Sequence, residues 1–193
     1  MKTKKKGLIY IFTGDGKGKT SAALGVVLRA CCAGLKVAWV AWYKQNLWQT
    51  CESKLSKLLP IDVFLLGKGF HILSSKSKAQ NAKLKTGGIV IDKTSEADHK
   101  LAAEAALTKA QEILKSQQYD VLICDEINNS LAEKLISLKK VEQMLVLSQK
   151  THVILTGRKA DKKLIDMADL VTEMKKIKHP YDKGIPALKG LDF

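Results

Sequence analysis

Short apolar runs alternate with longer segments of helical periodicity along most of the chain. The short runs are near-continuously apolar, which is typical of strands buried on both faces of a sheet. The segments between them place apolar residues three and four positions apart, which predicts amphipathic helices. The predicted strands are 8–12, 37–42, 61–66, 121–124, 153–155 and 170–172, and the predicted helices are 21–33, 98–115, 141–147 and 162–168.

This alternation predicts a single α/β domain over residues 1–193, with a mostly parallel sheet and helices on both faces. Ligands of such sheets bind beyond the carboxyl ends of the strands, so the residues that follow each strand are candidates for chemistry. One segment breaks the pattern. Residues 74–86 (SSKSKAQNAKLKT) are polar and lysine-rich without clear periodicity, which predicts a mobile excursion or lid that leads into the apolar run 88–91.

A glycine-rich loop lies between the first predicted strand and the first predicted helix. It reads Gly14-Asp15-Gly16-Lys17-Gly18-Lys19-Thr20. Glycine permits the positive φ values that turn backbone N–H groups toward an anion, and the helix N-terminus adds partial positive charge. In a phosphate loop of this kind, Lys19 reaches the terminal phosphates of ATP and the Thr20 hydroxyl ligates Mg²⁺. Counted from Gly14 the loop is one residue short of the usual pattern, and the alternative is a glycine turn that opens an ordinary helix.

Two carboxylates follow the predicted strand 121–124. Asp125 and Glu126 have the Walker-B arrangement, in which a rigid strand delivers acids to the metal ion on the phosphates. An acidic pair in this position is otherwise the start of a solvated loop. Together with the phosphate loop, the pair predicts a metal site made of Thr20, Asp125 and Glu126.

Arg158 follows the predicted strand 153–155 within the segment Thr156-Gly157-Arg158. Its place at a strand end makes a phosphate or ribose contact plausible, and a surface ion pair is the open alternative. The four histidines, at 71, 99, 152 and 179, are scattered, and we expect each to be structural or exposed. No Ser/His/Asp or Cys/His arrangement has a useful spacing.

Charge changes the picture only slightly. The formal net charge is +14 at pH 7, and of the 33 basic residues only Arg29 and Arg158 are arginines. The lysines are spread over the whole chain, whereas nucleic-acid interfaces gather basic residues on one face and favour arginine. A solvated lysine-rich surface and an anionic small ligand such as ATP therefore account for the charge, and a nucleic-acid partner is not favoured.

The chain has the features of a cytoplasmic protein. No apolar run approaches the roughly 20 residues of a membrane helix, and the basic residues 1–6 precede an apolar stretch too short for a signal peptide. Cys31, Cys32, Cys51 and Cys124 lack metal-ligand spacing. We expect buried free thiols, with Cys51 the candidate for an exposed one.

Four segments together resemble one enzyme family, the P-loop corrinoid adenosyltransferases, also called cob(I)yrinic acid a,c-diamide adenosyltransferases. The segments are GDGKGKT, LICDEIN, ILTGRKADKKLIDMADLVTEM and KIKHPYDKGIPALKGLDF. The resemblance runs over nearly the whole chain from Gly7, apart from residues 74–91. It implies a RecA-like P-loop fold and an unusual reaction, in which the Co(I) of a reduced corrinoid attacks the 5′ carbon of ATP and triphosphate leaves.

The resemblance also implies site residues. Gly14 to Thr20 would hold the triphosphate, with Lys19 and Glu126 as the catalytic pair and Arg158 at the nucleotide. Thr20 and Glu126, with Asp125, would hold Mg²⁺. Phe70, in Gly67-Lys68-Gly69-Phe70, would pack over the corrin face and help displace an axial ligand. A homodimer and a reduced flavoprotein as electron donor are also implied.

Three features depart from the family's pattern. Ile72 stands where the family has tryptophan, Asp15 stands where its phosphate loop has asparagine, and the lysine-rich segment 74–91 is additional. Two other functions stay open at this point: a RecA-like nucleic-acid-dependent ATPase, suggested by the charge, and a nucleotide-binding regulatory module without turnover, suggested by Asp15 and Ile72. Released triphosphate, released phosphate or no product distinguishes the three.

Overall fold

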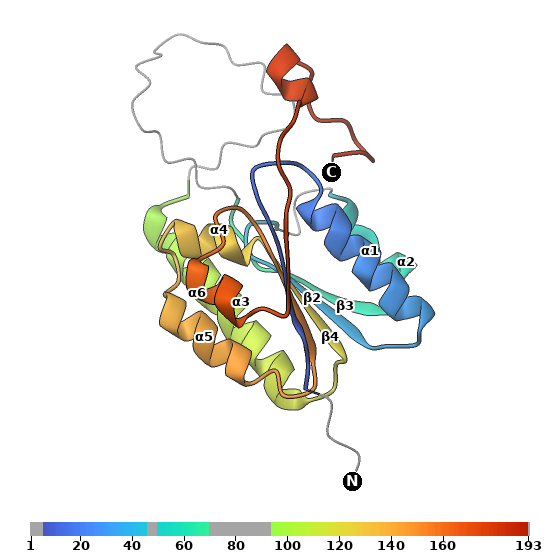
Figure 1. The fold of residues 1–193 in the computed structure, drawn as a ribbon, viewed down its shortest axis with the longest axis vertical. Helices are drawn as coiled ribbons and strands as arrows, with labels where there is room; N and C mark the ends of the chain where they lie inside the picture. The colour runs from blue at the N-terminus through green and yellow to red at the C-terminus, as the bar shows by residue number, and fades with distance from the viewer. Residues whose placement is uncertain (1–5, 46–49, 70–93, 193) are drawn as a thin grey trace.

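The computed structural model describes residues 6–45, 50–69 and 94–192 (Figure 1). Within these described residues, six strands form one sheet in the order β3-β2-β4-β5-β1-β6. Every pairing between these strands is parallel, so their carboxyl ends lie along one edge. The strands are β1 (Ile9–Thr13), β2 (Val37–Ala41), β3 (Ile61–Leu65), β4 (Val121–Asp125), β5 (His152–Thr156) and β6 (Leu170–Glu173).

Helices cover both faces of the sheet (Figure 1). On one face lie α1 (Lys19–Cys32) and α2 (Leu55–Leu58), and on the other lie α3 (Glu96–Ser116), α4 (Ile127–Ala132), α5 (Leu138–Val146) and α6 (Lys162–Met167). The described residues also include the 3₁₀ turns η1 (Cys51–Lys54) and η2 (Pro180–Lys183). The prediction of an α/β fold with a parallel sheet between two helical layers is confirmed.

The central strands contribute side chains to two hydrophobic cores. Trp39 on β2 packs in the core under α1 with Val27, whereas the next residue, Val40, packs in the core under α3 with Leu107. Successive strand residues point to opposite faces, so a strand between two helical layers must be apolar at every position. This requirement explains the near-continuous apolar runs in the sequence.

Predicted and observed boundaries differ where polar residues decide them. The predicted helix 98–115 begins earlier, at Glu96, because the Ser95 hydroxyl accepts a hydrogen bond from the Asp98 N–H at 3.2 Å. It ends where Gln117 adopts a left-handed conformation with φ of 52°. The pattern did not predict α4, since this six-residue helix carries Asn128 and Asn129 in its first turn.

The expectation of buried cysteines is correct for Cys124, which is buried in β4, and wrong for Cys32, which is exposed at the end of α1. Cys31 is partly buried and Cys51 is exposed, and all four thiols are free. Cys32 belongs to the same last turn as Ala30, which is buried in the core under α1, so exposure in this turn differs from one residue to the next. Among the described residues, no helix combines the length and apolar character of a membrane span.

Candidate functional site

The phosphate-loop residues connect the carboxyl end of β1 to the start of α1. Gly14 has φ of 104° and Gly18 has φ of 117°, values that side chains rarely tolerate. Gly18 caps α1, and neither a capping side chain nor an acidic residue of the first turn neutralises the helix N-terminus. The loop therefore presents the positive end of a 14-residue helix at the carboxyl edge of the sheet.

Lys19 folds back over this loop. Its ammonium group donates hydrogen bonds to the carbonyl oxygens of Gly16 at 2.7 Å and Gly14 at 3.0 Å. Burial lowers the pKa of Lys19, and the negative charge of Glu126 opposes that shift. A cation is thus held inside the loop, within the field of Glu126, the second residue of the acidic pair at the end of β4.

Asp125, the first residue of that acidic pair, is completely buried at the end of β4. One carboxylate oxygen accepts hydrogen bonds from the Thr20 hydroxyl at 3.1 Å and from the Thr156 hydroxyl at 2.8 Å. The other accepts from the ammonium group of Lys44 at 2.7 Å. Asp125 thereby ties α1, β5 and the segment after β2 together beneath the phosphate loop.

Lys44 is a functional-site residue that the sequence patterns did not single out. It also donates to Glu52 at 2.7 Å, so one buried ammonium joins two buried carboxylates. Burial alone would lower the pKa of Lys44, but Asp125 and Glu52 outweigh it and raise that pKa. Its only sequence signal is its position just after β2, at the edge where all the strands end.

Glu126, the second residue of the acidic pair, differs from Asp125 in its contacts. It has φ of 66°, and its N–H donates to the Thr156 hydroxyl at 2.9 Å. Its Oε2 atom is buried, with no hydrogen-bond partner among the described residues. Burial is the main cause and repulsion from Asp125 the second cause that raise the pKa of Glu126 to about 7. The carboxylate is therefore available for a cation, whereas Asp125 is fully engaged.

Arg158 lies at the same edge, directly after β5. A side chain on Gly157, which has φ of 127°, would meet the side-chain oxygen of Asn129 at 2.7 Å. That oxygen accepts a hydrogen bond from the Arg158 N–H, which anchors the turn to α4. The exposed guanidinium acts electrostatically on both Lys19 and Glu126, so it shares their surroundings.

Two other loop residues contact the C-terminal segment instead of their own loop. Asp15 accepts a hydrogen bond from the Lys176 N–H at 3.1 Å, which lowers the pKa of its exposed carboxyl. Lys17 donates to the Leu191 carbonyl at 2.7 Å and forms an ion pair with Asp192. The carboxylate of Asp15 thus contacts a backbone N–H of the C-terminal segment.

A cavity of about 250 Å³ separates the phosphate loop from the C-terminal segment. Its cationic side chains come from the loop and the turn after β5, and its apolar side chains come from the C-terminal segment. The lining residues are Asp15, Gly16, Lys17, Lys19, Arg158, His179, Pro180, Tyr181, Ile185, Pro186, Ala187 and Asp192. His179 was expected to be structural or exposed, and it is a half-buried residue of this lining.

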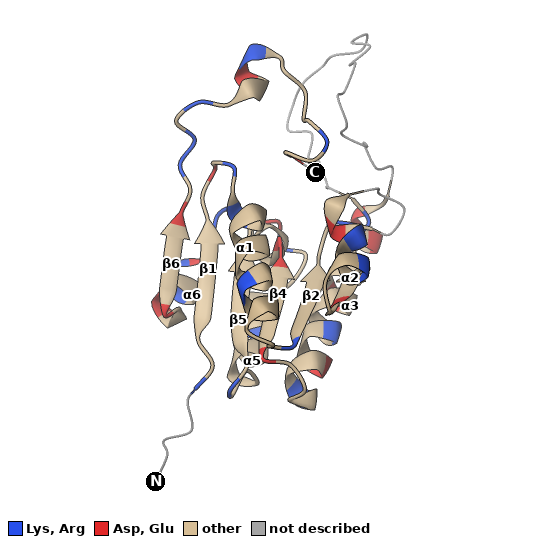
Figure 2. Ribbon diagram, turned by 90° about the vertical axis from the view of Figure 1, so that its right-hand side faces the viewer, with Lys and Arg blue, Asp and Glu red and all other residues tan. Residues whose placement is uncertain are grey.

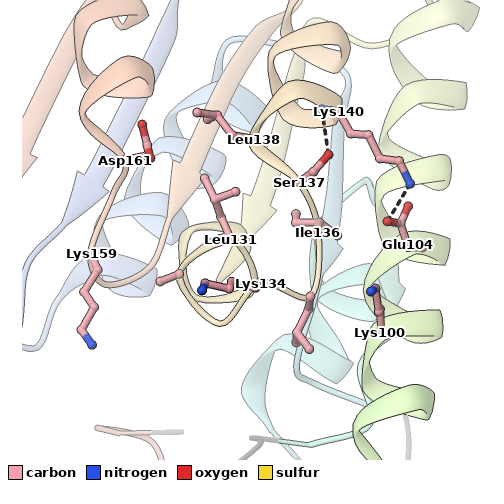
Figure 3. Close-up of a pocket in the computed structure, with 12 residues that line it drawn as sticks. Lys100, Glu104, Leu131, Lys134, Ile136, Ser137, Leu138, Lys140, Lys159 and Asp161 are labelled. Atoms are coloured by element: carbon pink, nitrogen blue, oxygen red, sulfur yellow. Dashed lines mark hydrogen bonds and ion pairs between the residues drawn. The ribbon is translucent and has the colours of Figure 1, made fainter.

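A larger cavity of about 550 Å³ lies among α3, α4, α5 and the segment after β5 (Figure 3). None of the predicted site residues lines it. Leu131, Ile136 and Leu138 form part of its apolar wall, and Lys140 reaches across to Glu104 at 2.7 Å. We assign no chemistry to this cavity, since its two carboxylates are already engaged, Glu104 by Lys140 and Asp161 by the Lys163 N–H.

The predicted corrinoid contact Phe70 lies outside the described residues, as do Ile72 and the segment 74–91. The residues just before Phe70 are described. Gly67 donates its N–H to the Lys44 carbonyl at 2.9 Å, and a side chain there would meet the Tyr43 backbone at 2.1 Å. This stretch of chain therefore runs directly beside the Lys44 segment.

The chain is similar over its whole length to known corrinoid adenosyltransferases. The family model described as ATP:corrinoid adenosyltransferase BtuR/CobO/CobP matches residues 5–193. A corrinoid adenosyltransferase of Sinorhizobium sp is 35% identical over 197 residues, which cover 100% of this chain and 83% of the relative. One of Pseudomonas aeruginosa is 31% identical, with 97% of this chain and 84% of the relative covered. One of Escherichia coli K12 is 28% identical, with 97% and 86% covered. The chain therefore belongs to the ATP:corrinoid adenosyltransferase family.

Proposed function

We propose that this protein transfers the 5′-deoxyadenosyl group of ATP to the Co(I) centre of a reduced corrinoid and releases triphosphate. The observation that carries the proposal is the convergence of Lys19, Glu126 and Arg158 around the phosphate loop. The match of residues 5–193 to the family supports the choice of reaction. A phosphate loop alone would not, because this fold serves many chemistries.

The reaction is a displacement at carbon. Co(I) supplies two electrons to form a Co–C bond with the 5′ carbon, and the C–O bond breaks with its electrons passing to the triphosphate. Positive charge around the leaving group stabilises the charge that develops there. Lys17, Lys19 and Arg158 would supply that charge, since all three line the cavity at the phosphate loop. The loop backbone would also fix the ribose so that cobalt approaches in line.

Mg²⁺ fits the residues beside Lys19. The buried Oε2 atom of Glu126 lacks a hydrogen-bond partner among the described residues, and the Thr20 hydroxyl is directed to the same acidic pair. Mg²⁺ takes oxygen ligands and usually keeps waters and substrate phosphates, so one carboxylate and one hydroxyl suffice. When bound, it would neutralise charge on the triphosphate.

Within this proposal the two acids have separate roles. Asp125 accepts hydrogen bonds on both oxygens, and it would orient Thr20 rather than act as the principal metal ligand. Glu126 would hold the cation. The described residues contain no group of three His, Cys, Asp or Glu side chains that could hold a metal alone, which agrees with a site completed by phosphates.

The remaining proposals concern partners. Phe70 would contact the corrinoid. A homodimer is supported by the exposed apolar side chains of Leu170 and Val171 on edge strand β6. A reduced flavoprotein is proposed as electron donor, and the charge of +14 would attract an acidic one. The four free thiols support a cytoplasmic location.

A RecA-like nucleic-acid-dependent ATPase is not favoured by the family match. The distribution of charge agrees, because Figure 2 shows lysine and arginine scattered over helices and loops among acidic residues. A nucleic-acid interface would gather them in one patch.

The test is an anaerobic reaction with MgATP and chemically reduced corrinoid, followed by the absorbance change of Co–C bond formation and by the light sensitivity of the product. Lys19→Ala should reduce turnover at least a hundredfold, because the leaving triphosphate loses a positioned charge (about 10²–10³ for one such group). Turnover equal to wild type in Lys19→Ala would refute the phosphate-loop assignment. An unchanged corrinoid spectrum with wild-type protein that binds MgATP would refute the proposed function.

A further inference from the structure

The chain returns over the phosphate loop after its last strand, β6. The Gly16 N–H donates to the Met174 carbonyl at 2.7 Å. Side chains on Gly14 or Gly16 would lie 2.3 Å and 2.7 Å from that carbonyl oxygen, so the two backbones meet at a distance that only glycine permits. Two residues after Met174, the Lys176 N–H donates a hydrogen bond to the Asp15 carboxylate.

The far end of this segment is also attached to the loop. Lys17 donates to the Leu191 carbonyl and pairs with Asp192, and the Asp192 carboxylate accepts a hydrogen bond from the Leu188 N–H at 2.7 Å. Between the two attachments the segment includes η2, held by an ion pair of Lys176 with Asp182 at 2.9 Å. Residues 174–192, called here the C-terminal strap, thus rise above the strand ends and come back to the loop (Figures 1 and 2).

The strap and the loop enclose the 250 Å³ cavity from opposite sides. Lys17, Lys19 and Arg158 make the loop side cationic. The two acids of the lining are already paired, Asp15 with the backbone of the strap and Asp192 with Lys17. The chemistry of the cavity therefore suits a polyanion that enters between loop and strap.

His179 is the half-buried polar residue that the strap contributes to this cavity. Its Nδ1 atom accepts a hydrogen bond from the Tyr181 N–H at 3.1 Å. A ring nitrogen that accepts carries no proton, so in the neutral ring the proton is on Nε2. The backbone of η2 thereby sets the tautomer and leaves Nε2 as the donor for a ligand.

We propose that the C-terminal strap is the second wall of the nucleotide site and that His179 donates a hydrogen bond from Nε2 to a phosphate oxygen of ATP. The proposal rests on the proposed function for its ligand, a nucleoside triphosphate. Lys17, Lys19 and Arg158 line the same cavity as His179, so phosphates that these cations attract enter the cavity that His179 lines. His179 is then a substrate-binding residue about 160 positions beyond the loop in sequence. The parallel pairing of β1 with β6 brings the segments that follow these two strands to the same edge of the sheet.

The experiment is isothermal titration of the full chain with MgATP and, separately, with magnesium triphosphate, which lacks the nucleoside. His179→Ala should weaken both ligands by about tenfold, the expected loss for one hydrogen bond to a charged group. His179→Gln, which keeps a side-chain donor, should recover part of the affinity. Ile177→Ala is the matched control, because Ile177 belongs to the same strap, is 90% exposed and does not line the cavity.

Each outcome decides the proposal. Affinities of His179→Ala within twofold of those of Ile177→Ala for both ligands would overturn it while leaving the nucleotide site intact. Loss of ATP affinity with unchanged triphosphate affinity would overturn the phosphate contact and place His179 at the nucleoside. Wild-type protein that binds neither ligand would overturn the nucleotide site itself. Circular dichroism of each variant separates lost binding from lost folding.

Discussion

Replacing Lys44 by methionine removes the cation that joins two buried carboxylates beneath the phosphate loop. The ammonium group lies 2.7 Å from both Asp125 and Glu52, and the side chains of the three residues are 11%, 0% and 7% exposed, respectively. Breaking a buried ion pair by removing one partner costs about 3–5 kcal/mol, because the remaining charge stays desolvated. We expect Lys44→Met to lose that much unfolding free energy, or roughly 10 °C of melting temperature.

Urea unfolding followed by circular dichroism measures this loss. Lys140→Met is the matched control, since Lys140 pairs with Glu104 at the same 2.7 Å but with side chains 51% and 31% exposed. Its loss should stay within about 1 kcal/mol. Adding Glu52→Gln to Lys44→Met should recover part of the loss, because one uncompensated carboxylate disappears.

The pH dependence of the wild-type protein follows from the same cluster. Burial raises the pKa of Glu52, but Lys44 outweighs it and holds that pKa below the ordinary value of 4.5. The stabilisation from Glu52 is therefore present above its unfolded pKa and lost as pH falls through the lowered folded pKa.

A loss of unfolding free energy in Lys44→Met that is no larger than the loss in Lys140→Met would refute the reasoning from the buried cluster.

Three further predictions concern the loop and its surroundings. Gly16→Ala should destabilise the protein by about 1–3 kcal/mol, because its side chain would meet backbone atoms at 2.7 Å. Gly25→Ala in α1, where nothing lies within 4 Å of the added side chain, should instead stabilise the protein by about 0.5–1 kcal/mol. Thermal unfolding compares the two variants, and equal effects would contradict the close approach at Gly16. Asp192→Asn should strengthen MgATP binding several-fold by releasing Lys17 from its ion pair, which titration calorimetry measures, and weaker binding would show that the pair supports the site. The affinity for MgATP should rise as pH increases through about 7, because Glu126 loses its proton there and can hold the cation. The rise in affinity should be smaller in Glu126→Gln, where it reports only the titration of ATP. An identical dependence of affinity on pH in the two proteins would remove Glu126 from the metal site.

Much of this architecture could be predicted because the central strands of the sheet are apolar at nearly every position. Two helical layers impose that pattern, and the residues that follow each strand then meet at one edge. Gly14–Thr20, Asp125, Glu126 and Arg158 all come to that edge in the structure. Their roles toward ATP and Mg²⁺ remain proposals, and the tests above address them.

The different contacts of Asp125 and Glu126 could not be predicted from their adjacent positions in the sequence. Asp125 is engaged because Lys44, 81 residues away, and Thr156 on β5 donate to it. Glu126 follows the strand with a left-handed backbone, and its Oε2 atom has no hydrogen-bond partner among the described residues. Both facts depend on strand order, which periodicity does not specify.

The C-terminal strap was equally beyond prediction from periodicity. Residues 174–192 contain glycine, proline and lysine without helical or strand spacing, and their path depends on the contact of the Met174 carbonyl with the Gly16 N–H. A short polar contact between distant backbones leaves no hydrophobic pattern. The sequence alone therefore does not distinguish His179 from a structural or exposed histidine, whereas the path of the strap places it in the lining of the cavity.

The identity of the released phosphate product tests the central claim most directly. Phosphorus NMR of a completed anaerobic reaction with MgATP and reduced corrinoid resolves triphosphate from ADP and orthophosphate. Attack at the 5′ carbon predicts one triphosphate for each Co–C bond formed. Orthophosphate and ADP in place of triphosphate would contradict the account, because they would show that water or another acceptor attacks phosphorus at this phosphate loop.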